Sequence, residues 1–89
     1  MAFIKVENLF GKVKVQIVTE NPDLFVYVTK SSLEAGGKDE CWYYVELGHD
    51  LTITFVEKNP DIKIQFVDKK EDARWVNKNH KLYKRLIRA

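Results

Sequence analysis

The sequence has little of what secreted or membrane proteins depend on. Cys41 is the single cysteine among 89 residues, so no disulfide can form within the chain, and packing and hydrogen bonds must hold the fold, as in a reducing compartment. No uninterrupted apolar run approaches the roughly 20 residues of a membrane span. The first residues also lack the long apolar stretch of a secretory signal. These absences predict a cytoplasmic protein that does not associate with membranes.

The composition is that of one ordinary globular domain. Apolar residues make up 45% of the chain and charged residues 31%, which is too apolar for intrinsic disorder. A chain this short cannot build a second core, so we expect a single domain over residues 1–89. The net charge of +2 is unevenly divided, because residues 1–68 carry −4 and residues 69–89 carry +6. The basic character therefore belongs to the C-terminal segment.

An internal repeat emerges when the chain is aligned with itself at an offset of 38 residues. Asn21-Pro22-Asp23 then falls on Asn59-Pro60-Asp61, and the apolar residues on both sides of the two tripeptides align as well. This match predicts a duplication of two units, residues 13–35 and 51–73. We expect each unit to hold a strand, a tight Asn-Pro-Asp turn and a second strand.

Alternating apolar and polar residues predict about six strands joined by short connections. The expected strands are Phe3–Val6, Val13–Ile17, Leu24–Val28, Cys41–Leu47, Leu51–Phe55 and Ile62–Phe66. Because parallel pairing normally needs long crossovers, the pattern favours an antiparallel meander or a small open barrel. Ser31–Ala35 is read as one helical turn. Apolar residues at helical spacing predict a C-terminal helix over Asn77–Arg88, so the expected class is α+β, mainly β.

The two strands that follow the repeated turns carry a resemblance to a known family. Asp23–Val28 and Asp61–Asp68 resemble the tandem Asp-Leu-x-Val-Tyr-x-Val-Asp strands of an uncharacterised family of short bacterial and phage proteins. The similarity extends to the aromatic residues Trp42–Val45 and to the segment Ala73–Tyr83 around Trp75, and so covers most of the chain. The resemblance implies a strand-rich fold and a bacterial or phage origin. It implies no functional site, because the family has no established activity.

No pattern in the sequence is typical of a catalytic or metal centre. Cys41 with His49 or His80 could serve as a nucleophile and its base, but the sequence does not bring them together. The possible ligands Glu46, His49, Asp50 and His80 lack the spacing of a metal site. We therefore expect no catalytic residue, metal or cofactor, and an enzyme of unfamiliar type is the third alternative for the function.

Four aromatic residues are candidates for a binding surface. On strict alternation they lie on the face of the sheet opposite the core. One interpretation is that the C-terminal helix and Trp75 cover them. The other is an exposed aromatic platform that binds a partner or stacks on nucleotide bases. The residues concerned are Phe25, Tyr27, Trp42 and Tyr44.

Basic residues recur every three or four positions near the C-terminus and would line one face of the predicted helix. Such a face can simply be solvated, or it can attract phosphates or an acidic protein surface. The candidates are Arg74, Lys78, Lys81, Arg85 and Arg88.

These observations favour a small non-catalytic binding module, a protein-binding or inhibitory accessory protein of bacterial or phage origin. The alternative is a nucleic-acid or nucleotide binder that uses the aromatic face and the basic helix. Strong salt dependence of binding would distinguish the alternative from the first hypothesis. The sequence does not define the partner or the oligomeric state.

Overall fold

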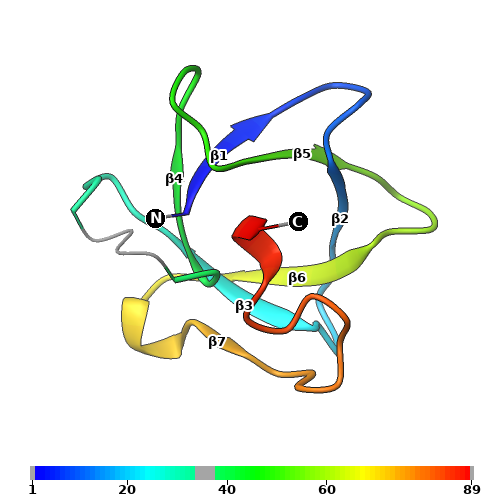
Figure 1. The fold of residues 1–89 in the computed structure, drawn as a ribbon. Helices are drawn as coiled ribbons and strands as arrows, with labels where there is room; N and C mark the ends of the chain where they lie inside the picture. The colour runs from blue at the N-terminus through cyan, green and yellow to red at the C-terminus, as the bar shows by residue number, and fades with distance from the viewer. Residues whose placement is uncertain (1, 34–37, 89) are drawn as a thin grey trace.

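The computed structural model describes residues 2–33 and 38–88, and Figure 1 shows its fold. The strands are β1 (Phe3–Val6), β2 (Val13–Ile17), β3 (Leu24–Val28), β4 (Cys41–Tyr44), β5 (Leu51–Phe55), β6 (Ile62–Val67) and β7 (Arg74–Trp75). Two short 3-10 helices, η1 (Lys70–Asp72) and η2 (Leu86–Arg88), complete the described elements. The predicted helical turn at Ser31–Ala35 reaches into residues 34–37, which lie outside the described part of the chain.

Six strands form a closed barrel in which every pairing is parallel. Their order is β4-β1-β5-β2-β6-β3, and pairing of β3 with β4 closes the ring. The short β7 pairs antiparallel with Leu24 and Phe25, whereas β4 pairs with Tyr27 and Val28 on the same strand. Closure removes the free strand edges of an open sheet.

The chain winds round this barrel in two laps. The strands of the first lap are β1, β2 and β3, and β4, β5 and β6 form the second, so that β5 lies between β1 and β2, and β6 between β2 and β3. Figure 1 shows the chain passing round the ring in one direction, from blue β1 to cyan β3 and again from green β4 to yellow β6.

An interval of eleven residues sets the winding. One strand and the connection after it carry the chain two strand positions onward, a third of the ring of six. The longer connection over residues 29–40 leads instead from β3 to its direct neighbour β4, which shifts the second lap by one position. Fully buried side chains follow the interval, at Ile4, Val15 and Val26 on the first lap and at Trp42, Ile53 and Ile64 on the second.

The predicted antiparallel meander is therefore wrong, and so is the small open barrel, because the ring is closed and parallel. A connection between two parallel strands is long when the chain must run back along the strand just completed before the next strand begins. Here each connection continues round the ring, so six residues are enough at 7–12, 18–23, 45–50 and 56–61. The two Asn-Pro-Asp segments lie in such connections and do not close hairpins.

The repeated segments have matching local structure. Asn21 and Asn59 both adopt a positive φ, of 52° and 54°, a conformation that asparagine tolerates better than most residues. The offset of 38 residues is two intervals of eleven plus the 16 residues that separate Val26 on β3 from Trp42 on β4. The last two residues of the first unit lie outside the described part of the chain.

Aspartates directly before three strands hold neighbouring strands in register. The Lys63 N–H donates to the Asp23 carboxylate at 2.9 Å, and the Asp23 N–H donates to the Lys63 carbonyl at 2.8 Å. The same two bonds join Asp61 to Lys14 and Asp50 to Phe3. The aspartate of the Asp-Leu motif is thus a backbone clamp that repeats round the ring.

The predicted C-terminal helix does not form, so the expected α+β class is wrong and the described fold is all-β. Lys84 has a φ of 58°, which an α-helix excludes, and only η2 is helical within residues 77–88. The apolar residues at helical spacing still pack inward, because Leu86 is fully buried and Leu82, Tyr83 and Ile87 lie against the core. Figure 1 shows this C-terminal segment, residues 77–88, crossing the middle of the ring of strands in a view along the barrel.

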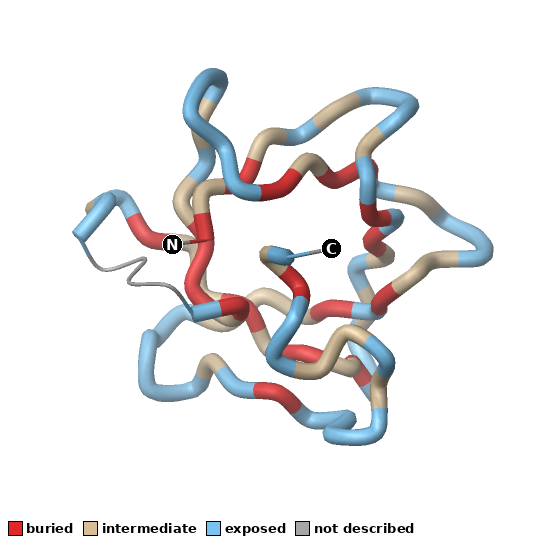
Figure 2. Tube along the Cα trace, in the orientation of Figure 1, coloured by how far each residue is buried: buried red, intermediate tan, exposed pale blue. Residues whose placement is uncertain are grey.

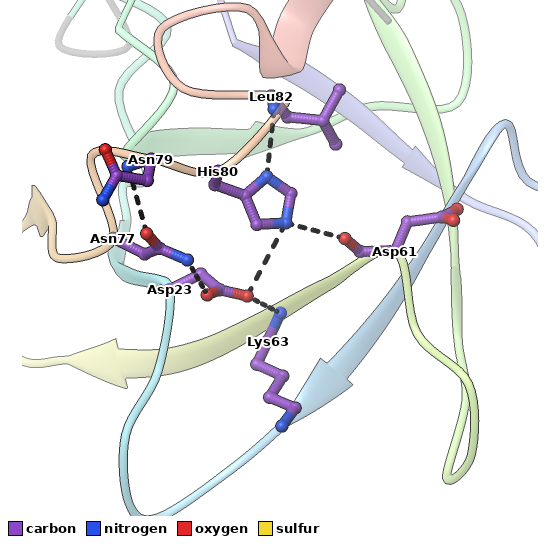
Figure 3. A network of polar contacts seen from close by, with 7 residues as sticks. All are labelled: Asp23, Asp61, Lys63, Asn77, Asn79, His80 and Leu82. Atoms are coloured by element: carbon purple, nitrogen blue, oxygen red, sulfur yellow. Dashed lines mark hydrogen bonds and ion pairs between the residues drawn. The ribbon is translucent and has the colours of Figure 1, made fainter.

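A polar network attaches the C-terminal segment to the amino ends of the strands, as Figure 3 shows. The Leu82 N–H donates to Nδ1 of His80 at 3.0 Å, so the proton of the neutral ring lies on Nε2, which donates to the Asp61 carbonyl at 2.8 Å. The Asn77 side chain donates to the Asp23 carboxylate at 3.1 Å. Because Asp23 and Asp61 directly precede β3 and β6, this segment covers the amino end of the barrel.

Asp39 provides a second, buried attachment for the C-terminal segment. Its carboxylate oxygens accept the N–H groups of Leu86 at 3.2 Å and Ile87 at 3.3 Å. Its carbonyl oxygen accepts the indole N–H of Trp42 at 2.7 Å. The side chain of Asp39 therefore fixes η2, while its backbone fixes the largest residue of the core.

Candidate functional site

The last inward-facing side chain of each barrel strand lies at the carboxyl end, away from the C-terminal segment. In their order round the ring these residues are Tyr44, Val6, Phe55, Ile17, Phe66 and Val28. We call these six residues the apolar mouth.

Strand register establishes that the mouth residues point inward. Paired residues of neighbouring strands project to the same face of a sheet, and the partner of every mouth residue is fully buried. The pairs are Tyr44 with Ile4, Val6 with Ile53, Phe55 with Val15, Ile17 with Ile64, Phe66 with Val26, and Val28 with Trp42. The mouth therefore continues the core outward to the surface.

The two ends of the barrel differ in exposure. At the mouth, Val6, Ile17, Tyr44 and Phe55 are 38–54% exposed, and Val28 and Phe66 are half-buried. At the amino end, the first inward residues are buried, namely Ala2, Val13, Leu24, Leu51 and Ile62. Figure 2 shows the buried residues gathered along the inner ring. A cluster of apolar side chains left partly open in this way is typical of an interaction surface.

Trp42 forms the floor of the mouth. It is fully buried, and its ring makes edge contacts with Phe66, at 6.1 Å between centroids, and with Tyr44, at 6.4 Å. The hydrogen bond from its indole N–H to Asp39 fixes the ring from the opposite side. The mouth thus rests on a fixed aromatic base, which lowers the entropy cost of binding.

Two hollows open at the mouth. One, of about 330 Å³, has Ile17 and Phe55 in its wall together with Glu57. The other, of about 180 Å³, has Val6 and Tyr44 together with Glu46. Each hollow has one glutamate in its wall and no basic residue, so each is suited to an apolar side chain that lies next to a positive charge.

Tyr44 is the mouth residue that titrates. Partial burial raises the pKa of its hydroxyl above the ordinary value of 10.0, because the charged form loses solvation. The hydroxyl is therefore protonated near neutral pH, and the mouth itself carries no charge there.

The four predicted aromatic residues do not form one patch. Phe25 and Tyr27 pair in register with Gln65 and Val67 on the outer wall, whereas Trp42 lies in the core and Tyr44 at the mouth. The C-terminal helix that could have covered the four is absent. Of the predicted set, the structure places Tyr44 and Trp42 together at the candidate site and Phe25 and Tyr27 elsewhere.

The predicted basic residues do not share a helix face. Arg74 lies on β7 with its guanidinium over the Phe25 ring at 5.2 Å, which joins one residue of each predicted group on the outer wall. Lys78, Lys81 and Arg85 are exposed in the C-terminal turns. Arg88 ends η2, near Lys84, which the sequence pattern did not select.

The described residues show no arrangement for metal binding. Residues 2–33 and 38–88 contain no cluster of three or more histidine, cysteine or acidic side chains that could hold a metal ion. Cys41 is buried, and the ring of His80 is held in the network of Figure 3. No helix in the described part of the chain is long and apolar enough to span a membrane.

The interleaved two-lap winding agrees with a comparison against known families. A family model described as the 7(1) septoil knot domain matches residues 3–76. The chain belongs to this family. The matched part of the chain thus contains β1 to β7, and residues 77–88 of the C-terminal segment lie beyond the match. The sequence motifs suggested an uncharacterised bacterial and phage family, whereas the match is to this specific knotted domain. A search of the curated proteins gave no match.

Sequence reasoning missed most of the mouth of the septoil knot. Ile17, Val28, Phe55 and Phe66 were assigned only to the buried face of their strands, and Val6 only to the end of a strand. Spacing could have found them, because Val6, Ile17 and Val28 lie eleven residues apart, as do Tyr44, Phe55 and Phe66. A repeated interval in parallel strands places equivalent residues at the same end of the barrel.

Proposed function

We propose that the protein is a small non-catalytic binding module that holds an apolar segment of another protein at its mouth. The observation that carries the proposal is the contrast between the two ends of the barrel. The amino end is covered by Leu86 and its neighbours, while four mouth residues at the carboxyl end stay at least 38% exposed. In α/β folds built on parallel strands, ligands commonly bind at the carboxyl ends of the strands, which is the end where the mouth lies.

The charges beside the mouth indicate the chemistry of the partner. Glu46 and Glu57 each lie in the wall of one hollow, and no basic residue accompanies them. A partner segment with apolar side chains next to lysine or arginine would match both the shape and the charge of this surface. The two hollows would each take one apolar side chain.

The sequence supports a compartment and a type of organism for this activity. A chain that cannot form an internal disulfide suits the cytoplasm. The tandem Asp-Leu-x-Val-Tyr-x-Val-Asp resemblance favours a bacterial or phage origin. In that setting, occupation of a partner's apolar segment would make the module an accessory protein or an inhibitor of that partner.

The experiment selects short peptides from a random display library against the wild-type protein and measures their affinity by calorimetry. We expect selected peptides to combine apolar residues with lysine or arginine. Phe55 is 38% exposed, so covering this exposed part of its roughly 200 Å² contributes about 2 kcal/mol, or about 30-fold in Kd. Phe55→Ala should weaken binding by that factor.

Phe25→Ala is the matched control, because it removes the same aromatic ring from the outer wall. It should change the affinity less than about threefold. Equal losses in both variants, or peptides without apolar residues, would contradict the proposal. Tight binding of a single-stranded oligonucleotide that falls steeply with salt and is unaffected by Phe55→Ala would favour the nucleic-acid alternative instead.

A further inference from the structure

A third hollow lies at the opposite end of the molecule from the mouth. It measures about 350 Å³ and lies between the C-terminal segment, which contributes Lys84, Ile87 and Arg88, and the wall formed by Trp75 and residues 38–40. Its volume falls within the range of about 300–1,000 Å³ that is usual for small-ligand sites.

Basic residues outnumber acidic residues in the wall of this hollow by three to two, a net charge of +1. Lys38, Lys84 and Arg88 lie in the wall, and none of them takes part in an ion pair within the described part of the chain. The acidic residues are Asp39 and Glu40. Both carboxylate oxygens of Asp39 accept backbone N–H groups of the C-terminal segment.

Two further observations distinguish this hollow from an ordinary basic surface. Trp75, which lies in its wall, is 8% exposed, and its indole N–H has no acceptor among the described residues. Buried N–H groups almost always have an acceptor. Lys84 has a φ of 58°, and lysine rarely adopts this left-handed conformation except where the surroundings impose it.

We propose that this hollow binds the phosphate group of inorganic phosphate or of a small phosphate monoester. The Arg88 guanidinium is the group best suited to a two-bond contact with phosphate oxygens. Lys38 and Lys84 add charge from opposite walls, and the Trp75 N–H can donate one bond to the bound anion. This site is independent of the peptide-binding mouth, because the two lie at opposite ends of the barrel.

The test titrates the wild-type protein, labelled with ¹⁵N, with inorganic phosphate, with adenosine monophosphate and with acetate at constant ionic strength. The indole N–H signal of Trp75 reports directly on the site, because Trp75 lies in the wall. We expect phosphate to shift the Trp75 signal to saturation. Acetate should give no saturation.

Arg88→Gln and Lys38→Gln should each raise the Kd for phosphate about tenfold. Lys81→Gln is the matched control, because Lys81 is exposed on the same segment and does not line the hollow; it should leave the Kd within about twofold. Saturation by both phosphates identifies the phosphate group as sufficient, and saturation by the monophosphate alone shows that the ester is required; both results support the site. Equal response to acetate, no saturation by either phosphate, or equal loss in Lys81→Gln would overturn it.

Discussion

Replacement of Leu86 by alanine tests whether the C-terminal segment seals the barrel. Leu86 is fully buried and packs within the core, and its N–H is held by Asp39 at 3.2 Å. Deletion of a buried leucine side chain costs about 2–5 kcal/mol, and the larger costs occur where the surroundings cannot collapse. Because every barrel strand is hydrogen-bonded on both sides, we expect a loss of about 3–4 kcal/mol.

The assay is equilibrium unfolding in urea followed by tryptophan fluorescence. A loss of this size is a large fraction of the roughly 5–15 kcal/mol that stabilises a small domain. Leu47→Ala is the control, because Leu47 is 87% exposed and its truncation should change the free energy of unfolding by less than about 0.5 kcal/mol. If Leu86→Ala cost less than about 1 kcal/mol, the amino end would not be sealed and the contrast between the two ends would fail.

Three further variants test separate contacts. In the wild-type protein the pKa of Tyr44 is raised above 10.0 in the folded state, so the unfolded state releases this proton first and the free energy of unfolding falls as the pH rises. Tyr44→Phe lacks this proton and should therefore lose less stability than wild type between pH 9 and pH 11. The same dependence of stability on pH in the two proteins would contradict this. Gly11→Ala should lower the free energy of unfolding by at least about 1–3 kcal/mol in chemical denaturation, because an added Cβ would lie 2.3 Å from the Ile53 carbonyl carbon. An unchanged denaturation midpoint would show that Gly11 does not lie this close to the Ile53 backbone. His80→Ala should speed hydrogen exchange at the Leu82 amide, whose acceptor is Nδ1 of that ring, and unchanged protection would refute the role of His80 in holding the C-terminal segment.

Alternation predicted the strand positions well because it depends only on which residues are buried. Leu24 and Val26 were placed in the core and both are fully buried. One interpretation had a C-terminal helix cover the aromatic face opposite the core, but that helix does not form and Leu86 packs into the core instead. The burial of Leu24 and Val26 followed from their neighbours in the sequence, and did not require knowledge of how the strands are ordered.

Strand direction was not predictable from the same pattern, because alternation is identical in parallel and antiparallel strands. The rule that parallel strands need long crossovers assumes a return along the strand just formed, and this chain continues round a ring instead. The regular eleven-residue interval between Ile4, Val15 and Val26 was the signal for that winding. The 38-residue repeat concealed it, because that repeat spans a whole lap.

The position of two of the predicted aromatic residues differs from the expectation for a related reason. A fourth strand read as Cys41–Leu47 puts Trp42 and Tyr44 on the face opposite the core. The strand ends at Tyr44, and the interval of eleven residues from Trp42 to Ile53 puts both aromatic residues on the inward side. The placement of the basic residues also differs from the expectation, because no helix brings them to one face. Arg88 lines a hollow together with Lys84, which no linear pattern indicates.

The most direct test of binding at the mouth is amide chemical-shift mapping of a selected peptide on the ¹⁵N-labelled protein. Perturbations should concentrate at the mouth residues Val6, Ile17 and Phe55 and at the neighbouring Glu46 and Glu57, while the amides of β7 and of the C-terminal segment stay unchanged. Perturbations confined to β7 and the C-terminal segment, with the mouth amides unmoved, would show that the partner binds elsewhere and would contradict the proposed function.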